Sequence, residues 1–370
     1  MKKKLAIICA SNGNKQLVNK AKEMGIETHC FAWDKEGYNQ CKGVADYFHP
    51  ISVLEKEQIL DKCREIKIDG VTSIFKDYAI PIVAYVAENM GLPGNRYEDM
   101  LLASGSKYTM RQAFYKHGVK SPRFANAHDE IDLSEFRYPL IVKANDRTGS
   151  VGVMKVVKEE DLQDAIWKAQ DLSFRKEVII EEFISGAEAS VDTISWNGEH
   201  HILVIKEREI AVIDNLPMII ASHFPYELPV NIQDKIVIET KKVLDSINYK
   251  YGASNTEFKI TDTGEIYAIE TNPRMAGGTS HILLKLHNGY DLIKGLIDVA
   301  LGQFEKPVFT HKKYAGDYVC REFTENIRRA IENKENDPDI IEAELYSEDE
   351  IFLGRIGHLI YQSDRKRRWK

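Results

Sequence analysis

Long apolar runs are missing from the sequence, and so are the features of an exported protein. No window approaches the ~18–20 apolar residues that a membrane-spanning helix needs. The apolar run from Leu5 to Ala10 follows three lysines, but it is too short for the core of a signal peptide and leads into Ser11-Asn12-Gly13. We therefore expect a soluble protein with no membrane partner.

Cysteine is scarce and scattered. The chain has five cysteines and no C-x-x-C pair, which argues against a disulfide framework and against structural zinc. Free thiols fit a reducing compartment, so we expect a cytoplasmic location. The cysteines are Cys9, Cys30, Cys41, Cys63 and Cys320.

The sequence also lacks an excess of positive charge. Its 50 Lys and Arg residues stand against 57 Asp and Glu residues, which gives a formal net charge of -7. This balance provides no general attraction to nucleic acid, so we expect no nucleic-acid partner. The basic segment 365–370 is the exception. We interpret it as a solvated terminus, with contact to phosphate or nucleic acid as the alternative.

Several common fingerprints are absent. The chain contains neither G-x-S-x-G nor the Walker pattern G-x-x-x-x-G-K-[ST]. After the first apolar run only Gly13 is present where G-x-G-x-x-G would be required, so side chains would crowd a pyrophosphate there. Asp34 stands where a ribose-binding acid would sit, but the missing glycines disfavour an NAD-dependent oxidoreductase.

The length and the order of the predicted elements indicate more than one domain. A chain of 370 residues usually forms two or three. Strands and helices alternate as far as Gly91-Leu92-Pro93-Gly94, which predicts an α/β domain at residues 1–94 with a parallel sheet covered on both faces. The predicted strands are 5–10, 27–33 and 70–75, and the predicted helices are 16–24, 54–66 and 78–90.

From residue 95 onward the pattern indicates an α+β arrangement. We predict a second domain at 95–305, followed by a mixed C-terminal segment at 306–370 in which 332–339 forms a polar loop. The predicted helices are 107–117, 161–169 and 232–247, and the predicted strands are 140–144, 151–157, 178–183, 189–196, 201–206, 253–260 and 265–271.

A phosphate-binding loop is one interpretation of residues 138–153. Lys143 ends an apolar strand, a polar loop with Gly149, Ser150 and Gly152 follows, and a second strand continues. Glycines let backbone N–H groups approach phosphate oxygens, and a strand-borne lysine supplies a fixed positive charge. A plain β-hairpin turn with a surface lysine fits the same residues. Lys107, at a helix start, is a further candidate.

A pair of acids on a predicted hairpin suggests a metal site. If Thr263-Gly264 is a two-residue turn, Glu257 faces Glu270, and Asn272 lies on the same face of the sheet. Opposed carboxylates repel each other, and a divalent cation such as Mg²⁺ relieves that repulsion. An exposed edge hairpin with solvated acids is the alternative.

Arg274 follows the hairpin directly, ahead of Gly277 and Gly278. An arginine beside a metal could stabilise negative charge on a transferring phosphoryl group, which makes Arg274 the candidate catalytic residue. A surface-loop arginine is the alternative.

Taken in order, these motifs resemble the ATP-grasp superfamily, particularly its carboxylate–amine and amino-acid ligase branch. The resemblance extends to about Gly302. Its most specific parts are Val142-Lys143 with Thr148-Gly149-Ser150-Val151-Gly152-Val153, then Ile180-Glu181-Glu182-Phe183-Ile184-Ser185-Gly186-Ala187-Glu188, then Glu257 with Ile269-Glu270-Thr271-Asn272-Pro273-Arg274. It implies a Rossmann-like N-terminal domain followed by an ATP-grasp fold with a mobile lid subdomain at about 121–184.

The resemblance also implies roles for the matching residues. Lys107 and Lys143 would contact the phosphates of ATP, and the loop from Gly149 to Gly152, including Ser150, would close over the triphosphate. Glu181, Glu182 and Ile184 belong to the segment that would read adenine, and Glu188 would bind the ribose. Glu257, Glu270 and Asn272 would hold Mg²⁺, with Mn²⁺ as an alternative ion, and Arg274 would steady an acyl-phosphate.

Some assignments stay open at this point. The lysine in Gly105-Ser106-Lys107 lacks the aspartate that often precedes it in this branch. His223, in an H-x-P element, could face the substrate or be structural. Arg321 and Arg355 are candidate anion anchors.

The expected reaction has two steps. A substrate carboxylate attacks the γ-phosphate of ATP, and an amine then displaces phosphate from the acyl-phosphate to form an amide. The expected partners are a small carboxylate and a small amine, and a homodimer is left open. The alternatives are carboxylation with bicarbonate and a nucleotide-binding sensor without turnover.

Overall fold

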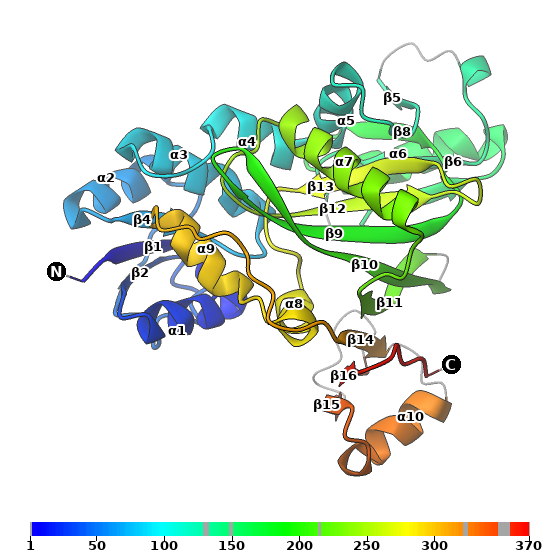
Figure 1. Ribbon diagram of the computed structural model, residues 1–370. Coiled ribbons are helices and arrows are strands. Elements are labelled where there is room, and N and C mark those ends of the chain that lie inside the picture. Colours follow the sequence, from blue (N-terminus) through cyan, green and yellow to red (C-terminus); the bar gives the residue numbers. More distant parts are fainter. Residues whose placement is uncertain are drawn as a thin grey trace.

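The computed structural model of the chain describes residues 2–128, 133–147, 151–213, 216–320, 325–346 and 356–369. Its N-terminal part is a parallel sheet of four strands within these residues, in the order β3-β2-β1-β4 (Figure 1). The strands are β1 (Lys4–Ile8), β2 (Glu27–Phe31), β3 (Tyr47–His49) and β4 (Gly70–Thr72). The predicted parallel sheet is confirmed, although β3 was not predicted.

Helices cover both faces of this sheet, because alternate residues of each strand point to opposite sides. Leu5 and Ile7 pack against α1 and against α9, which comes from much later in the chain, while Ala6 and Ile8 pack against α2 and α3. The helices are α1 (Lys15–Glu23), α2 (Lys56–Ile66), α3 (Ile80–Met90) and α9 (Leu292–Ala300).

A second, antiparallel sheet has the order β5-β8-β6-β7. Helix α6 (Leu162–Leu172) covers one of its faces through Leu162, Ala165 and Ala169. Figure 1 shows this unit at the upper right, projecting from the rest of the molecule. Its strands are β5 (Phe124–Asn126), β6 (Leu140–Ala144), β7 (Val153–Val156) and β8 (Val178–Glu182). Before it the chain forms α4 (Tyr97–Gly105) and α5 (Lys107–Lys116).

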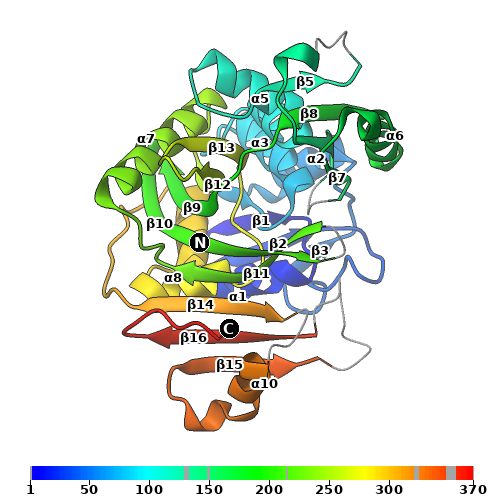
Figure 2. The same cartoon turned by 90° about the vertical axis from the view of Figure 1, so that its right-hand side faces the viewer.

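The largest sheet of the described residues has eight strands in the order β13-β12-β9-β10-β11-β14-β16-β15, and every pair is antiparallel. Figure 2 shows its later strands succeeding one another down the molecule, with α10 beside the last of them. The strands are β9 (Ala187–Trp196), β10 (Glu199–Ile213), β11 (Leu216–Phe224), β12 (Gly252–Ile260), β13 (Ile266–Asn272), β14 (Tyr314–Cys320), β15 (Ile340–Leu345) and β16 (Gly357–Ser363).

Three further helices pack on this sheet. Helix α7 (Val230–Ser246) covers one face through Ile232, Ile236 and Val243, while α8 (Ser280–Asn288) and α9 belong to a separate core that joins this sheet to the N-terminal sheet. Helix α10 (Glu325–Glu332) packs on the C-terminal strands. No helix among the described residues combines the length and the apolar character needed to cross a membrane.

The prediction of a solvated C-terminal tail is wrong. Trp369 packs edge-on against Tyr318 and Tyr361, with ring centroids 5.4 and 5.3 Å apart. Arg367 pairs with Asp337 at 2.7 Å, and Arg368 pairs with Glu207 at 2.9 Å. Lys366, Arg367 and Arg368 therefore have acidic partners within the protein, while Arg365 is exposed.

Several other elements differ from the sequence predictions. Helix α4, strand β11 and all C-terminal strands were not predicted, and the strand predicted at 201–206 is the middle of the longer β10. The predicted polar loop at 332–339 contains a 3₁₀ turn, Lys334–Asn336. The domain boundaries at 94 and 305 stay predictions.

Candidate functional site

The hairpin of β12 and β13 brings Glu257 opposite Glu270, and Asn255 opposite Asn272. The predicted two-residue turn is wrong: Ile260 pairs with Ile266, and Gly264 donates from its backbone N–H to the carbonyl of Thr261 at 2.8 Å. A register shift between Glu257 and Phe258 compensates for the longer turn and restores the expected pairing of Glu257 with Glu270. Phe258 pairs with Ala268, so Ile269 is an extra residue in β13.

Arg111 uses the extra residue. Its guanidinium donates from Nη2 to the carbonyl oxygen of Ile269, which the bulge has removed from regular pairing. The side chain is only 1% exposed, and its Nε lies 2.5 Å from Oε1 of Glu181. Sequence reasoning missed Arg111: it lies on the buried face of α5 together with Met110 and Phe114, but its polar partners come from β8 and β13.

Glu181 lies between two cations. Its Oε1 contacts Arg111, and its Oε2 lies 2.5 Å from Nζ of Lys143. Burial alone would raise the pKa of this carboxyl, but Arg111 and Lys143 outweigh it and lower the pKa to about 2. Glu181 is therefore ionised, and it fixes the position of Lys143.

Lys107 and Lys143 are held near each other by Asn145. The side chain of Ser106 caps α5 by accepting from the N–H of Thr109, so Lys107 is the first residue of the helix. The amide oxygen of Asn145, two residues after Lys143, accepts from the backbone N–H of Tyr108 at 2.8 Å. The lysine at the helix start and the lysine on the strand are thus parts of one local framework.

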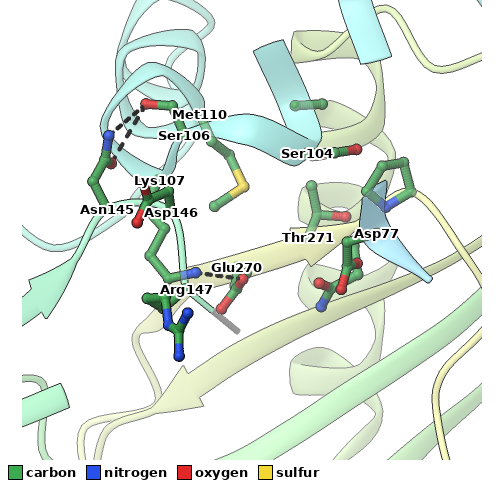
Figure 3. Close-up of a pocket in the computed structure, with 13 residues that line it drawn as sticks. Asp77, Ser104, Ser106, Lys107, Met110, Asn145, Asp146, Arg147, Glu270 and Thr271 are labelled. Carbon is green, nitrogen blue, oxygen red and sulfur yellow. Dashed lines mark hydrogen bonds and ion pairs between the residues drawn. The ribbon is translucent and has the colours of Figure 1, made fainter. Parts of the chain in front are cut away.

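Each acid of the hairpin pair has a cationic partner. Nζ of Lys107 lies 3.1 Å from Oε1 of Glu270, and Nη1 of Arg208 lies 2.6 Å from Oε1 of Glu257. Burial would raise the pKa of Glu270, but Lys107 and Lys143 outweigh that effect and hold it below its ordinary value. Figure 3 shows the Lys107–Glu270 pair inside a pocket that Arg147 and Asp77 also line.

Arg274 is anchored on the N-terminal part of the chain. Its Nε lies 2.8 Å from Oδ1 of Asp77, and its Nη2 lies 3.4 Å from Oδ1 of Asn272. Asp77 belongs to the 3₁₀ turn Asp77–Ala79 that follows β4. Sequence reasoning did not single out Asp77, since nothing local marks an acid whose partner is 197 positions away.

A buried polar network holds Arg208 in position. Asp192 binds Nζ of Lys206 through both oxygens, at 2.9 and 2.8 Å, and accepts from Ser280 and Asn255 at 2.8 and 2.7 Å. Asn255 in turn accepts from Nη2 of Arg208 at 3.3 Å. Each of these polar side chains has a hydrogen-bond partner, and a fully paired network of this kind is rigid.

The remaining predicted site residues that the structure describes lie on or beside strands β7, β8 and β9. Oε1 of Glu188 is 2.7 Å from Nζ of Lys259, and Glu182 accepts from the backbone N–H of Arg137 at 3.0 Å. Ile184 follows β8 and is half-buried. Gly152 has a φ of +73°, and a Cβ there would come within 3.0 Å of Cβ of Ala144. Gly149, Ser150, Arg321 and Arg355 lie outside the described residues.

His223 is structural. It is fully buried, its Nδ1 lies 2.8 Å from the hydroxyl of Tyr361, and its Nε2 lies 3.2 Å from Oε1 of Glu209. Both ring nitrogens therefore have partners within the protein.

The donor set suits a hard divalent cation. Two carboxylates and one amide oxygen, from Glu257, Glu270 and Asn272, meet on paired strands, and oxygen ligands are what Mg²⁺ prefers. Their partners are the cations Arg208, Lys107 and Arg274, so positive charge is accommodated beside each of the three residues. Within the described residues, no three His, Cys, Asp or Glu side chains cluster as a metal site.

Comparison with known proteins gives a consistent result. Residues 136–282 match the ATP-grasp domain family. The D-alanine–D-alanine ligase of Rickettsia canadensis is 29% identical over 40% of this chain and 42% of its own length, and the alanine–anticapsin ligase of Bacillus subtilis is 28% identical over 70% and 62%. The chain thus spans less than two thirds of these relatives. An L-amino acid ligase structure from Bacillus licheniformis has a TM-score of 0.80 at 23% identity, covering 98% of this chain and 94% of that one.

Proposed function

We propose that this chain, which carries an ATP-grasp domain, is an ATP-dependent carboxylate–amine ligase that forms an amide or peptide bond and releases ADP and phosphate. The observation that carries the proposal is the opposed pair Glu257 and Glu270, surrounded by Lys107, Lys143 and Arg208. The two relatives named above are both called ligases, and both names include alanine. We include a cytoplasmic location, which the free, buried thiols of four cysteines suit.

The proposed nucleotide site uses the residues of the lid and hinge. Lys107 and Lys143 bind phosphate oxygens, and the loop with Gly149, Ser150 and Gly152 covers them. The segment Glu181, Glu182 and Ile184 reads adenine through its backbone, and Glu188 accepts from the ribose hydroxyls. To bind the ribose, Glu188 gives up its ion pair with Lys259.

The proposed metal ligands are Glu257, Glu270 and Asn272. Mg²⁺, or Mn²⁺ in its place, neutralises negative charge on the phosphates when bound. Ion pairs exchange at the same time: Lys107 leaves Glu270 for a phosphate oxygen, and Arg208 is released from Glu257. In the proposed complex, the phosphates thus take over the cations that pair with these acids.

The proposed reaction needs positioning more than acid–base chemistry. An oxygen of the substrate carboxylate attacks the γ-phosphorus, and the bond to the β-phosphate oxygen breaks to release ADP. Arg274, held by Asp77, stabilises the negative charge of the acyl-phosphate. The amine nitrogen then attacks the acyl carbon, phosphate leaves, and the nitrogen loses a proton.

ADP release tests the proposal. The full chain is incubated with MgATP and a panel of amino acids, singly and in pairs, and ADP, phosphate and amide products are measured. Glu270→Gln should abolish ADP release without unfolding the protein. The matched control is Glu265→Gln, on the same hairpin, where the side chain is 51% exposed and pairs with Lys120. Unchanged turnover in Glu270→Gln would contradict the proposal.

Two other outcomes separate the alternatives. ADP release that depends on bicarbonate and needs no organic carboxylate would indicate a carboxylase. Binding of ATP with no ADP release under any substrate combination would indicate a sensor.

A further inference from the structure

Two residues in the left-handed backbone region mark one edge of the N-terminal sheet. Cys9 directly follows β1 with a φ of +57°, and Phe75 lies shortly after β4 with a φ of +67°. This conformation is costly for residues other than glycine, and such strain gathers at functional sites. Because β1, β2 and β4 are parallel, their carboxyl ends share this edge, which is where open α/β sheets bind ligands.

Three large aromatic side chains are exposed at the same edge. Trp33 follows β2, Tyr38 lies in the next loop, and Tyr78 is the neighbour of Asp77. Their exposed fractions are 43%, 49% and 53%. We call Trp33, Tyr38 and Tyr78 the aromatic wall.

The members of the aromatic wall share one end of the parallel sheet. The rings of Trp33 and Tyr38 meet edge to face, with centroids 5.9 Å apart. Tyr78 lies past the carboxyl end of β4, next to Asp77, and β4 and β2 flank β1 in the sheet. The wall therefore follows the carboxyl ends of β2 and β4, and Tyr78 adjoins the acid that pairs with Arg274.

The loop that carries Trp33 and Tyr38 is fixed in place. Asp34 binds Nζ of Lys42 at 2.6 Å and accepts from Nδ2 of Asn39 at 2.8 Å. Cys41 is fully buried, and its thiol donates to the carbonyl of Ser11 at 3.4 Å. Exposed rings on a fixed loop are prepared for a ligand, because binding then orders little additional chain.

The charges beside the wall favour an anion. Lys35 places its ammonium 4.3 Å from the centre of the Trp33 ring. Of the three acids next to the wall, Asp34 is paired with Lys42 and Asp77 with Arg274, and Glu36 is exposed in the same loop. A second cation, Lys76, lies within electrostatic reach of Cys9. An aromatic surface with surplus positive charge suits a ring that bears a carboxylate.

We infer that the aromatic wall binds a planar aromatic or heteroaromatic ring of the carboxylate substrate. The inference rests on the proposed ligase function and specifies its substrate class. The ring packs against Trp33 and Tyr38, and the carboxylate points past Tyr78 toward Arg274. Aliphatic acids of similar size lack the ring contacts and bind more weakly.

Binding is tested on the full chain without turnover. Saturation-transfer NMR is recorded with benzoate, nicotinate and L-phenylalanine as ring-bearing probes, and with propionate and L-leucine as ringless ones. Trp33→Leu and Tyr38→Leu should each weaken binding of the ring-bearing probes about five-fold, and Trp33→Phe should restore it. Matched controls are Trp167→Leu and Tyr115→Leu, whose side chains are equally large and 62% and 78% exposed elsewhere.

Turnover gives the second readout. In ADP release, the wall variants should raise KM for ring-bearing acids and leave KM for ringless acids and for ATP unchanged. An equal change for both classes of acid, or the same loss in the Trp167→Leu control, would overturn the inference. If no acid yields ADP while the probes still bind through Trp33, the ligase proposal is wrong but the aromatic wall is a binding site for rings. If only ringless acids are turned over, the inference about the aromatic wall is wrong but the ligase proposal is supported.

Discussion

Arg274 and Asp77 form a two-point ion pair across 197 positions of sequence: Nε lies 2.8 Å from Oδ1, and Nη2 lies 3.3 Å from Oδ2. Paired contacts of this kind hold a guanidinium plane in one orientation. The pair connects the loop after β13 with the turn after β4, so the N-terminal sheet orients a residue of the proposed catalytic centre.

Replacing Arg274 tests that arrangement. Arg274→Lys keeps the charge but cannot make both contacts to Asp77, and we expect kcat for ADP release to fall about 10²-fold or more. Asp77→Asn should lower kcat by about ten-fold, since the guanidinium remains but loses its orientation. Arg96→Lys, at a side chain that is 61% exposed, serves as the control. A kcat within about three-fold of the wild-type value for Arg274→Lys would contradict the assigned role.

Removing the charge of Glu181 should destabilise the protein strongly. Glu181→Gln leaves Arg111 and Lys143 buried without their shared carboxylate, and losing one partner of a buried pair costs about 3–5 kcal/mol. Urea unfolding measures this loss. Glu199→Gln, which removes an exposed partner of Lys306, should leave the unfolding midpoint almost unchanged. Equal midpoints for the two variants would refute the argument.

Stability should fall in mild acid because of His49. Burial, with help from the charges of His29 and Lys62, lowers its pKa to about 4, whereas the unfolded value is about 6.5. As the pH falls, the unfolded state therefore takes up a proton before the folded state does. The stability that neutral His49 contributes is complete above pH 6.5 and is lost as the pH falls toward 4. Allowing for partial exposure, we expect a loss of about 1 kcal/mol near pH 5.

The measurement is urea unfolding between pH 7 and 4.5. His49→Gln should flatten the pH dependence, and the exposed His117→Gln should leave it as in the wild type. A residual slope is expected from His281, whose pKa burial also lowers to about 4. Identical slopes in His49→Gln and the wild type would rule out this origin.

The C-terminal tail should contribute to stability through Arg367. Arg367→Ala removes contacts to Asp337 and Asp339 and a cation 4.8 Å from the Trp369 ring. We expect a loss of about 1 kcal/mol, larger at low salt because screening weakens partly exposed pairs. Thermal unfolding at two salt concentrations measures it, with the exposed Lys312→Ala as the control. If Arg367→Ala and the wild type have the same unfolding midpoint at both salt concentrations, Arg367 does not contribute to stability.

The sequence predicted the hairpin pair correctly, although the turn was wrong. Counting from Thr263-Gly264 puts Glu257 opposite Glu270, and the structure pairs them. The agreement depends on Ile269, because the longer turn shifts the register by one and the bulge shifts it back. Turn length is poorly encoded locally, whereas two acids on neighbouring strands are visible in the sequence.

Partners that come from distant parts of the chain could not be predicted. Arg111 reads as an ordinary helical arginine until β13 and β8 are placed beside it, and Arg208 reads as one charge in an alternating strand. The prediction for the C-terminal tail was wrong for a related reason. Composition indicated a solvated segment, but acids on β10 and near β15 neutralise it. Pairing of charges across a fold depends on topology, which composition does not contain.

The eight-stranded sheet has a practical consequence for anyone who trims this protein. Strand β14 forms hydrogen bonds to β11, so the region after residue 305 is joined to the centre that carries Glu257 and Glu270 through consecutive strands. A chain shortened before Tyr314 would leave β11 with a bare row of amide and carbonyl groups, which attracts strands from other molecules. Shortened versions should therefore be recovered as aggregates, even though the ATP-grasp family match itself ends at residue 282.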